Sequence, residues 1–145
     1  MAITQLSVFA ENKPGSLVSI TQILAEEGVD IRALSLADTS DYGILRLIVS
    51  DTEKAQNALS NAGLALHLSP VIGVAMSDRP GALSEVLTTL EENNINIEYM
   101  YAFISRLAED AYVILRTEHT EQAEMILKEN GAKLLTEQDI ETHLG

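Results

Sequence analysis

Apolar and polar positions pass through the same succession of periods twice along the chain. An alternation with a period of two, typical of a β-strand, covers residues 6–10 and returns over residues 72–76. Each alternation gives way to a helical period, which Leu17, Ile20 and Leu24 carry in the first round. Two strand-like runs, a second helical run and a last strand-like run complete each round. The pattern therefore predicts strand, helix, strand, strand, helix and strand, twice over.

The two rounds are copies of one another. Pro14 and Gly15 recur 66 residues later as Pro80 and Gly81, and the offset becomes 68 in the later part of each copy, after an expected hairpin turn. This period is longer than that of solenoid repeats, so each copy is interpreted as a small domain. We expect domains at residues 1–69 and 70–145, the second with a short C-terminal helix. Almost no linker separates them, because a strand-like run continues through Pro70.

Six elements in this order predict the ferredoxin-like fold, of the α+β class. Right-handed crossovers place both helices on one face of an antiparallel sheet, which leaves the other face bare. A solvated face should alternate to polar residues, yet these strands are apolar on both faces, with Phe9, Ile44 and Tyr112 out of phase with the core positions. We expect each bare face to be buried against a second sheet, within a dimer.

Local signals refine these elements. The apolar phase slips after Ile31 in the first copy and after Ile97 in the second, which predicts a β-bulge in each. Gly28 follows the first helix as a candidate C-cap residue. Thr136, followed by Asp139 three residues later, predicts a capping box at the start of the C-terminal helix.

Composition and charge limit the partners. The chain has 145 residues and 46% hydrophobic content, but domains of roughly 70 residues are marginal alone and should pack on each other or on a second chain. A net charge of −13 repels nucleic-acid backbones and anionic membranes, so neither partner is expected. There is no cysteine, no apolar run near the ~20 residues of a membrane span, and no signal-peptide pattern at the start. A cytoplasmic location is expected.

The Pro-Gly corners carry the clearest candidate chemistry. "ENKPGSL" (residues 11–17) and "SDRPGAL" (residues 77–83) each join a strand to a helix. We expect Pro14 at the first helical position and Gly15 to leave the backbone open to approach. The N–H groups of residues 15–17 would then face an anion at the positive end of the helix dipole. The simpler interpretation is a structural corner alone, and both interpretations stay open.

These stretches resemble ACT domains. "FAENKPGSLVSITQILAEEGVDI" and "AMSDRPGALSEVLTTLEENNINI" share an Asn/Asp-x-Pro-Gly-x-Leu corner, a small residue or Asn after the first helix, and a following Asp/Asn-Ile. The resemblance covers essentially the whole chain, and the regulatory domain of phosphoglycerate dehydrogenase is similar. It implies a ligand-sensing module, most often for amino acids, with sites between two domains. Such a site uses the corner of one domain and the second strand of its neighbour.

The resemblance implies a set of ligand-binding residues in each copy. They are Asn12, Pro14, Gly15, Ser16, Leu17 and Asp30 in the first copy, and Asp78, Gly81, Ala82, Leu83 and Asn96 in the second. Helix N-terminal amides would hold an α-carboxylate, and Asp30 would hold the ammonium. Asp78 stands where Asn is commoner, and its charge would repel a carboxylate. The first corner paired with Asn96 is therefore the preferred site.

No constellation for catalysis or metal binding is apparent. His67, His119 and His143 are scattered and fit no metal-ligand spacing, so no metal or cofactor is expected. We expect a free-standing amino-acid sensor without a fused catalytic domain, regulatory and homodimeric, acting through a separate metabolic enzyme or regulator. A dimerisation or protein-interaction module that binds no ligand is the alternative, and a small enzyme of ferredoxin-like fold is the rival from another class.

Overall fold

The structure, a computed structural model, describes residues 3–38, 42–77, 79–102 and 110–142. The first half holds β1 (Ile3–Glu11), α1 (Ser16–Glu26), β2 (Ile31–Asp38), β3 (Tyr42–Val49) and α2 (Thr52–Asn61). β4 (Leu66–Ser77) runs from the first half into the second. The second half adds α3 (Ala82–Glu92), β5 (Ile97–Ala102), β6 (Asp110–Thr117), α4 (Thr120–Glu129), β7 (Lys133–Leu134) and α5 (Glu137–Thr142). The predicted order of elements is confirmed in both copies.

β4 is a continuous strand that belongs to both halves. The hydrogen-bonded order of strands is β2-β3-β1-β4-β6-β5, with β7 beside β4. The N-terminal part of β4 pairs with β1, ending at Val71 opposite Ile3, and its C-terminal part pairs with β6 from Ile72 onward. Pro70 lies where β4 has a strand neighbour on one side only, which a residue without an N–H tolerates. The expected boundary between residues 69 and 70 thus falls inside a strand.

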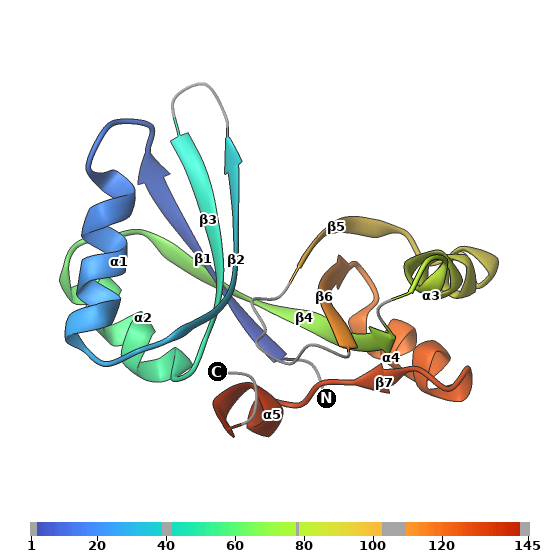
Figure 1. Ribbon diagram of the computed structural model, residues 1–145. Coiled ribbons are helices and arrows are strands. Elements are labelled where there is room, and N and C mark those ends of the chain that lie inside the picture. Colours follow the sequence, from blue (N-terminus) through green and yellow to red (C-terminus); the bar gives the residue numbers. More distant parts are fainter. Residues whose placement is uncertain (1–2, 39–41, 78, 103–109, 143–145) are drawn as a thin grey trace.

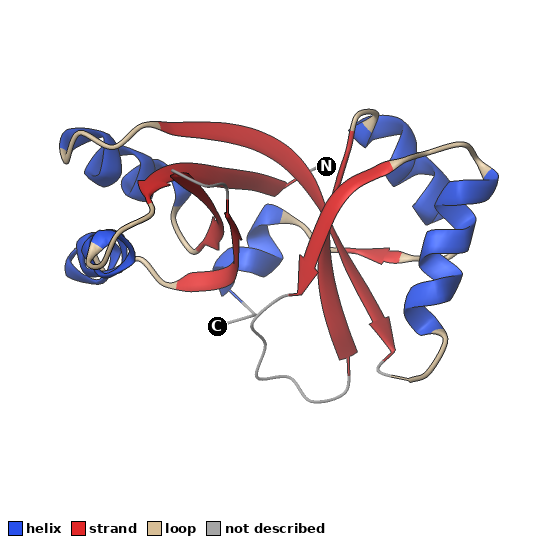
Figure 2. Cartoon of the chain, turned by 90° about the horizontal axis from the view of Figure 1, so that it is seen from above, coloured by secondary structure: helices blue, strands red, loops and turns tan. Residues whose placement is uncertain are grey.

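Each half has its helices on one face of its sheet. α1 and α2 cover the outer face of the first sheet, and α3 and α4 cover the outer face of the second (Figures 1 and 2). Leu24 of α1 and Leu59 of α2 pack on alternate strand residues such as Leu47, because a strand directs every second side chain to the same face. This arrangement confirms the tandem ferredoxin-like fold of the α+β class.

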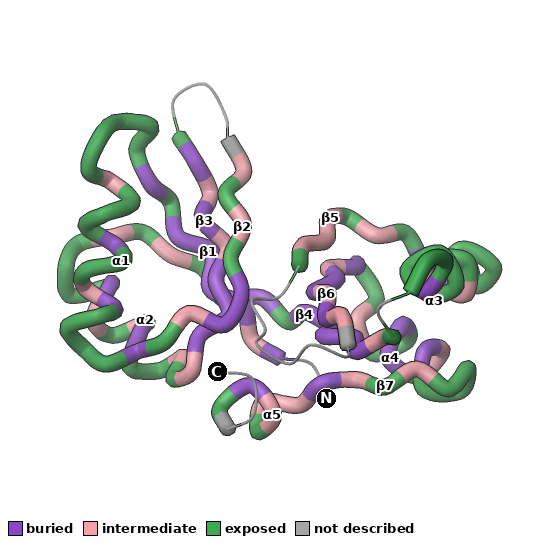
Figure 3. The backbone as a smooth tube through the Cα atoms, viewed as in Figure 1, coloured by how far each residue is buried: buried purple, intermediate pink, exposed green. Residues whose placement is uncertain are grey.

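The bare faces of the two sheets pack against each other within one chain. Their shared cluster joins Ile3 and Ile48 of the first half to Ile114 and Leu135 of the second, all nearly inaccessible to solvent. Figure 3 shows the buried segments converging where the two halves meet. The expected second sheet is present, but it is supplied by the same chain. Phe9, near the end of β1, lies outside this cluster and stays 44% exposed within the chain. Only the inner parts of the two faces are covered, and those parts give no reason for a dimer.

A buried polar network crosses the same interface. Gln5, fully buried on β1, donates from Nε2 to the Tyr99 hydroxyl at 2.7 Å and accepts at Oε1 from the Tyr101 hydroxyl at 2.6 Å. The Arg46 guanidinium lies 3.8 Å from the centre of the Tyr99 ring. Burial, reinforced by Tyr99 and opposed by Arg46, raises the pKa of Tyr101 well above its ordinary value. The network fixes the relative position of β1 and β5, because a buried polar group without its hydrogen-bond partner is strongly unfavourable.

Both predicted β-bulges are present. The register between β2 and β3 shifts between Ile31 and Ala33, and the register between β5 and β6 shifts between Ile97 and Tyr99. In the first copy the residue without a cross-strand partner is Arg32.

The predicted capping box is also formed. Asp139 N–H donates to Thr136 Oγ1 at 3.1 Å, and Thr136 N–H donates to Asp139 Oδ2 at 2.9 Å. Gly28 adopts a φ of 71° just after α1, as expected for its place past the helix end. No helix in the described part of the chain is long and apolar enough to cross a membrane.

Candidate functional site

The first Pro-Gly corner is a type II β-turn that leads into a helix. Ser16 N–H donates to the Lys13 carbonyl at 3.4 Å, with Pro14 and Gly15 at the two central positions. Gly15 has φ 94° and ψ −18°, the left-handed conformation that this turn requires at its third residue. The second corner repeats the turn, with Gly81 at φ 90°. The Pro-Gly pair is explained by turn geometry, since Pro fixes φ at the second position and Gly tolerates the third.

Two details expected from the sequence are wrong. Pro14 is not the first helical residue, because α1 begins at Ser16 with Gly15 as its N-cap. Ser16 N–H is not free for a ligand, because the turn uses it. The N–H groups of Leu17 and Val18 lie in the first turn of α1 and have no acceptor within the described part of the chain. They are the donors that the first turn of α1 leaves available to an anion.

A cavity of about 180 Å³ lies between the first corner and strand β2. Asn12 and Leu17 line it together with Leu36 of β2 and Gly43 of β3. Among the described residues the Asn12 side chain has no hydrogen-bond partner, so it does not cap α1. Lys13, which also lines the cavity, forms an exposed ion pair with Glu11 at 3.1 Å. This cavity therefore collects two of the predicted residues and an ion pair, because Glu11 lines it as well.

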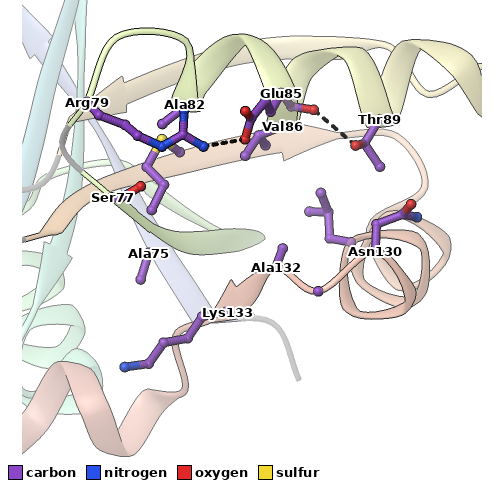
Figure 4. Close-up of a pocket in the computed structure, with 13 residues that line it drawn as sticks. Ala75, Ser77, Arg79, Ala82, Glu85, Val86, Thr89, Asn130, Ala132 and Lys133 are labelled. Atoms are coloured by element: carbon purple, nitrogen blue, oxygen red, sulfur yellow. Dashed lines mark hydrogen bonds and ion pairs between the residues drawn. The ribbon is translucent and has the colours of Figure 1, made fainter.

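The other side of each corner carries a second kind of cavity. In the first copy it measures about 550 Å³ and is lined by Pro14, Gly15 and Ser16 together with the chain that follows α2. In the second copy the corresponding cavity measures about 270 Å³, and Ala82 lines it (Figure 4). The duplication has thus placed a hollow at the same point of both domains. Leu83 is exposed on α3 beside the second corner.

The two corners differ in how far the chain covers them. Arg79 reaches across the second cavity, and its Nη2 lies 2.8 Å from Glu85 Oε2 on α3 (Figure 4). Its Nη1 would lie 3.9 Å from a Cβ atom at Gly81, whereas nothing approaches that position at Gly15 within 4 Å. Ser19 occupies the place of Glu85 in the first copy and carries no charge. The first corner is therefore the more open of the two. Asp78, the predicted polar residue of the second corner, lies outside the described residues.

The predicted second-strand residues do not reach the corners within one chain. Asp30 precedes β2, at the opposite end of α1 from Gly15, and the eleven residues of α1 span about 16 Å. Asn96 precedes β5, and Figure 1 shows the start of β5 and the first corner on opposite sides of the molecule. Among the described residues, those that line the two cavities beside the first corner all belong to the first half. A site that joins a corner to Asp30 or Asn96 needs a second chain.

An apolar strip lies exposed beside the 180 Å³ cavity. Leu34 and Leu36 of β2 are 45% and 48% exposed, and Leu17 of α1 is 40% exposed. β2 pairs with β3 on one side and has no strand on its other side among the described residues. The sequence did not reveal this strip, because the alternation of β2 marks Leu34 and Leu36 as core positions without showing that α1 leaves them uncovered.

No group of three or more His, Cys, Asp or Glu side chains in the described ranges is arranged to hold a metal ion. His67 lies on β4 and His119 precedes α4, while His143 lies outside the described residues.

Comparison with known proteins places the chain in a family. It matches the ACT domain pair family over residues 1–144, and it belongs to that family. The chain is similar to the solved structure of protein BT0572 from Bacteroides thetaiotaomicron, with 39% identity and a TM-score of 0.92, over 98% of this chain and 97% of that one. No curated protein matches the sequence.

Two further solved structures share the fold. The ligand-free regulatory subunit of aspartate kinase from Thermus thermophilus aligns with a TM-score of 0.65 and 18% identity, over 88% of this chain and 91% of that one. The regulatory subunit of aspartate kinase from Thermus flavus aligns with a TM-score of 0.61 and 19% identity, over 89% and 92% of the two chains. The described residues belong to an ACT domain pair, with no catalytic domain evident among them.

Proposed function

We propose that this chain is a regulatory sensor that binds an amino acid at the first Pro-Gly corner, at an interface between two copies of the chain. The observation that carries the proposal is the open cavity at this corner, lined by Asn12 and Leu17, next to the exposed leucines of an unpaired strand edge. The regulatory aspartate kinase subunits that share the fold support a regulatory role.

The strand register supports a homodimer built through β2. Asp38, at the end of β2, pairs with Gly43, which in turn pairs with Ala10 beside the corner. If two β2 edges pair antiparallel, the end of one strand lies beside the start of the other. Asp30 would then come close to the partner's corner. β5, at the other end of the strand order, suits this role less, because its start and the first corner lie on opposite sides of the molecule (Figure 1).

The chemistry of this arrangement suits an α-amino acid. The N–H groups of Leu17 and Val18 would receive the carboxylate at the positive end of the α1 dipole. The Asn12 amide can both donate and accept hydrogen bonds, and Asp30 from the second copy would accept from the ammonium. The exposed leucines would exclude water from the interface. We propose no catalytic role, and we propose that a separate metabolic enzyme or regulator in the cytoplasm receives the signal.

Calorimetry against the common amino acids, combined with sedimentation, tests this proposal. Asn12→Ala should weaken binding by roughly tenfold, the effect of one lost hydrogen bond to a charged group. Leu36→Lys should give monomers and abolish binding, because it places charges along the strand edge. Met125→Lys is the matched control, since Met125 is 62% exposed on α4, away from this edge, and it should change neither property. Full affinity in a monomeric Leu36→Lys variant would refute the interface site.

A dimerisation module without a ligand is the second candidate, and the exposed strip favours it too. The outcome that would support it is a dimer, lost in Leu36→Lys, that gives no heat and no thermal shift with any amino acid. A true binder present at 100 times its dissociation constant stabilises a protein by about 2.7 kcal/mol, so its thermal shift would be visible.

A further inference from the structure

Arg32 is a buried charge placed by the bulge of β2. It has no cross-strand partner, so its side chain leaves the normal alternation of the strand. Only 9% of the side chain is exposed, and its Nη1 lies 2.6 Å from Asp30 Oδ2. The Asp30 side chain is 66% exposed. One carboxylate oxygen therefore faces the buried arginine, and the carboxylate itself remains open to solvent.

The remaining donors of Arg32 hold the C-terminal helix. Its Nε donates to the Ile140 carbonyl at 3.0 Å and its Nη2 donates to the Glu141 carbonyl at 3.2 Å. These carbonyls lie at the end of α5, where the helix leaves acceptors without partners and where a cation is favourable. Arg32 thus caps a helix whose residue Ile140 lies 108 positions away in the sequence.

α5 is in turn fixed to the body of the protein by two contacts, and its own first turn is closed by a capping box. The capping box of Thr136 and Asp139 closes its N-terminus. Glu137 Oε1 accepts a hydrogen bond from the Thr4 backbone N–H at 2.7 Å. Ile140 is 1% exposed and packs in the cluster between the two sheets. The helix therefore presents its terminal carbonyls to Arg32 from a rigid position.

We propose that Arg32 is a positioning residue of the ligand site, and that α5 holds Arg32 in place, so that the C-terminal helix acts as a distant support of that site. This inference rests on the proposed function, in which Asp30 receives a ligand ammonium. A docked α5 orients Arg32, Arg32 orients the Asp30 carboxylate, and the ligand binds the carboxylate oxygen that Arg32 leaves free. Ligand binding and docking of α5 then favour each other.

A ligand ammonium that shares the Asp30 carboxylate with Arg32 fits the structure better than one that displaces Arg32. If the ligand displaced Arg32, a guanidinium that is nine-tenths buried would lose its counter-ion, which is strongly unfavourable. A carboxylate can accept at both oxygens, so the ammonium need not break the ion pair. The coupling therefore has a definite sign: ligand should tighten α5 and not release it.

The second copy lacks this linkage. Glu98 occupies the corresponding bulge position and lies 3.7 Å from Arg116, an ion pair whose side chains are 40% and 26% exposed. Arg116 donates to the Pro70 carbonyl and the Thr120 hydroxyl, and it bonds to none of the described residues of α5. Glu98→Gln is accordingly the matched control for changes at Arg32, with the same place in the fold and no contact to the C-terminal helix.

The hydrogen bonding of Arg32 to α5 can be measured without any ligand. The Arg32 Nε–H signal in a nitrogen-correlated NMR spectrum should exchange slowly with solvent in the full chain. Thr136→Ala removes the hydroxyl acceptor of the capping box and should loosen α5, so that this signal exchanges at least several-fold faster. Thr136→Ser keeps the hydroxyl and should restore slow exchange. The inference would be overturned if the α5 backbone amides of Thr136→Ala exchange faster, which shows that the helix has loosened, while the Arg32 Nε–H still exchanges as slowly as in the wild type.

A second experiment measures binding of whichever common amino acid binds the wild-type chain. Arg32→Gln and Thr136→Ala should weaken its binding by roughly tenfold, with Thr136→Ser and Glu98→Gln near the wild type. Saturating amino acid should slow hydrogen exchange of the α5 amides several-fold. Normal affinity in Thr136→Ala, or faster α5 exchange with ligand, would overturn this inference and leave the proposed function intact. Failure of every amino acid to bind the wild type would overturn both.

Discussion

Single residues at the corners show how a common type of turn and a ligand site can be confused. Gly15 has open space where a side chain would project, which suits an approaching ligand. Its φ of 94° nevertheless demands glycine whether or not a ligand exists. Gly81 has the same conformation in a corner that Arg79 partly covers. The presence of glycine therefore reports the turn, and the function must be sought in the side chains around it.

Gly15→Ala should destabilise the protein by about 1–2 kcal/mol in the absence of any ligand, because the left-handed conformation is strained for a residue with a Cβ atom. Gly15→Asn should cost less, because Asn tolerates this conformation better. Urea unfolding measures both. Ser19→Ala, an exposed change on α1, is the control and should stay within about 0.5 kcal/mol of the wild type. A neutral Gly15→Ala would show that the turn relaxes at no cost.

Tyr101 should make the protein lose stability at alkaline pH. Its pKa is raised by burial first and by Tyr99 second, so the folded chain keeps this proton after the unfolded chain has lost it near pH 10. The folded state then binds more protons, and stability falls as pH rises above about 10, by at most about 1.4 kcal/mol per pH unit from this group. Below pH 10 the group contributes no slope.

Urea unfolding between pH 8 and pH 11.5 checks this slope. Tyr101→Phe should start less stable at pH 8, because Gln5 Oε1 loses its donor, and should then decline less steeply above pH 10. Tyr42→Phe, at a position 56% exposed, should keep the wild-type slope. An equal slope in Tyr101→Phe and the wild type would exclude Tyr101 as its source.

Among the helices and strands, those features that depend on neighbouring residues could be predicted from the sequence. The bulge after Ile31 and the capping box at Thr136 follow from local patterns, and both are present. The start of α1 could not be placed, because a Pro-Gly pair suits both a helical first turn and a type II turn. The sequence predicted that a second sheet buries the bare faces, but it could not show that this sheet belongs to the same chain. An apolar face is the same whether its partner lies in the same chain or in another. Arg32 was missed for the same reason: its partners in α5 are distant in sequence.

β4 provides an element-level test at Gly73. A Cβ atom there would lie 3.0 Å from Leu135 Cδ1 and 3.3 Å from Ile3 Cδ1, in the packed cluster between the sheets. Gly73→Ala should therefore destabilise the protein by about 1–3 kcal/mol through overpacking. Gly43→Ala is the matched comparison, because its Cβ atom would lie 3.1 Å from Leu36 Cδ1, whose side chain is exposed and can turn away. Thermal unfolding should rank Gly73→Ala clearly below Gly43→Ala, and the reverse order would contradict this account of the packing.

In the whole molecule, the duplication has produced two domains that share a strand and a core. β4 pairs with β1 in one half and with β6 in the other, and α5 returns from the end of the second half to Arg32 of the first. The cluster between the sheets takes residues from both halves, among them Ile48 and Ile114. Neither half can bury its bare face alone, so each half depends on the other for its stability.

The chain should consequently unfold as one cooperative unit, and its halves should not fold separately. A fragment of residues 1–69 would expose Ile3 and Ile48 to solvent and would lose Val71, the last partner of β1 on β4. Domains near 70 residues have little stability to lose, so this exposure should exceed what remains. Calorimetry of the full chain should show a single unfolding transition. Its calorimetric and van't Hoff enthalpies should agree, as they do when the whole chain unfolds as one unit. Circular dichroism of fragments 1–69 and 70–145 should show no cooperative melting, and a sharp transition in either fragment would prove that half independent.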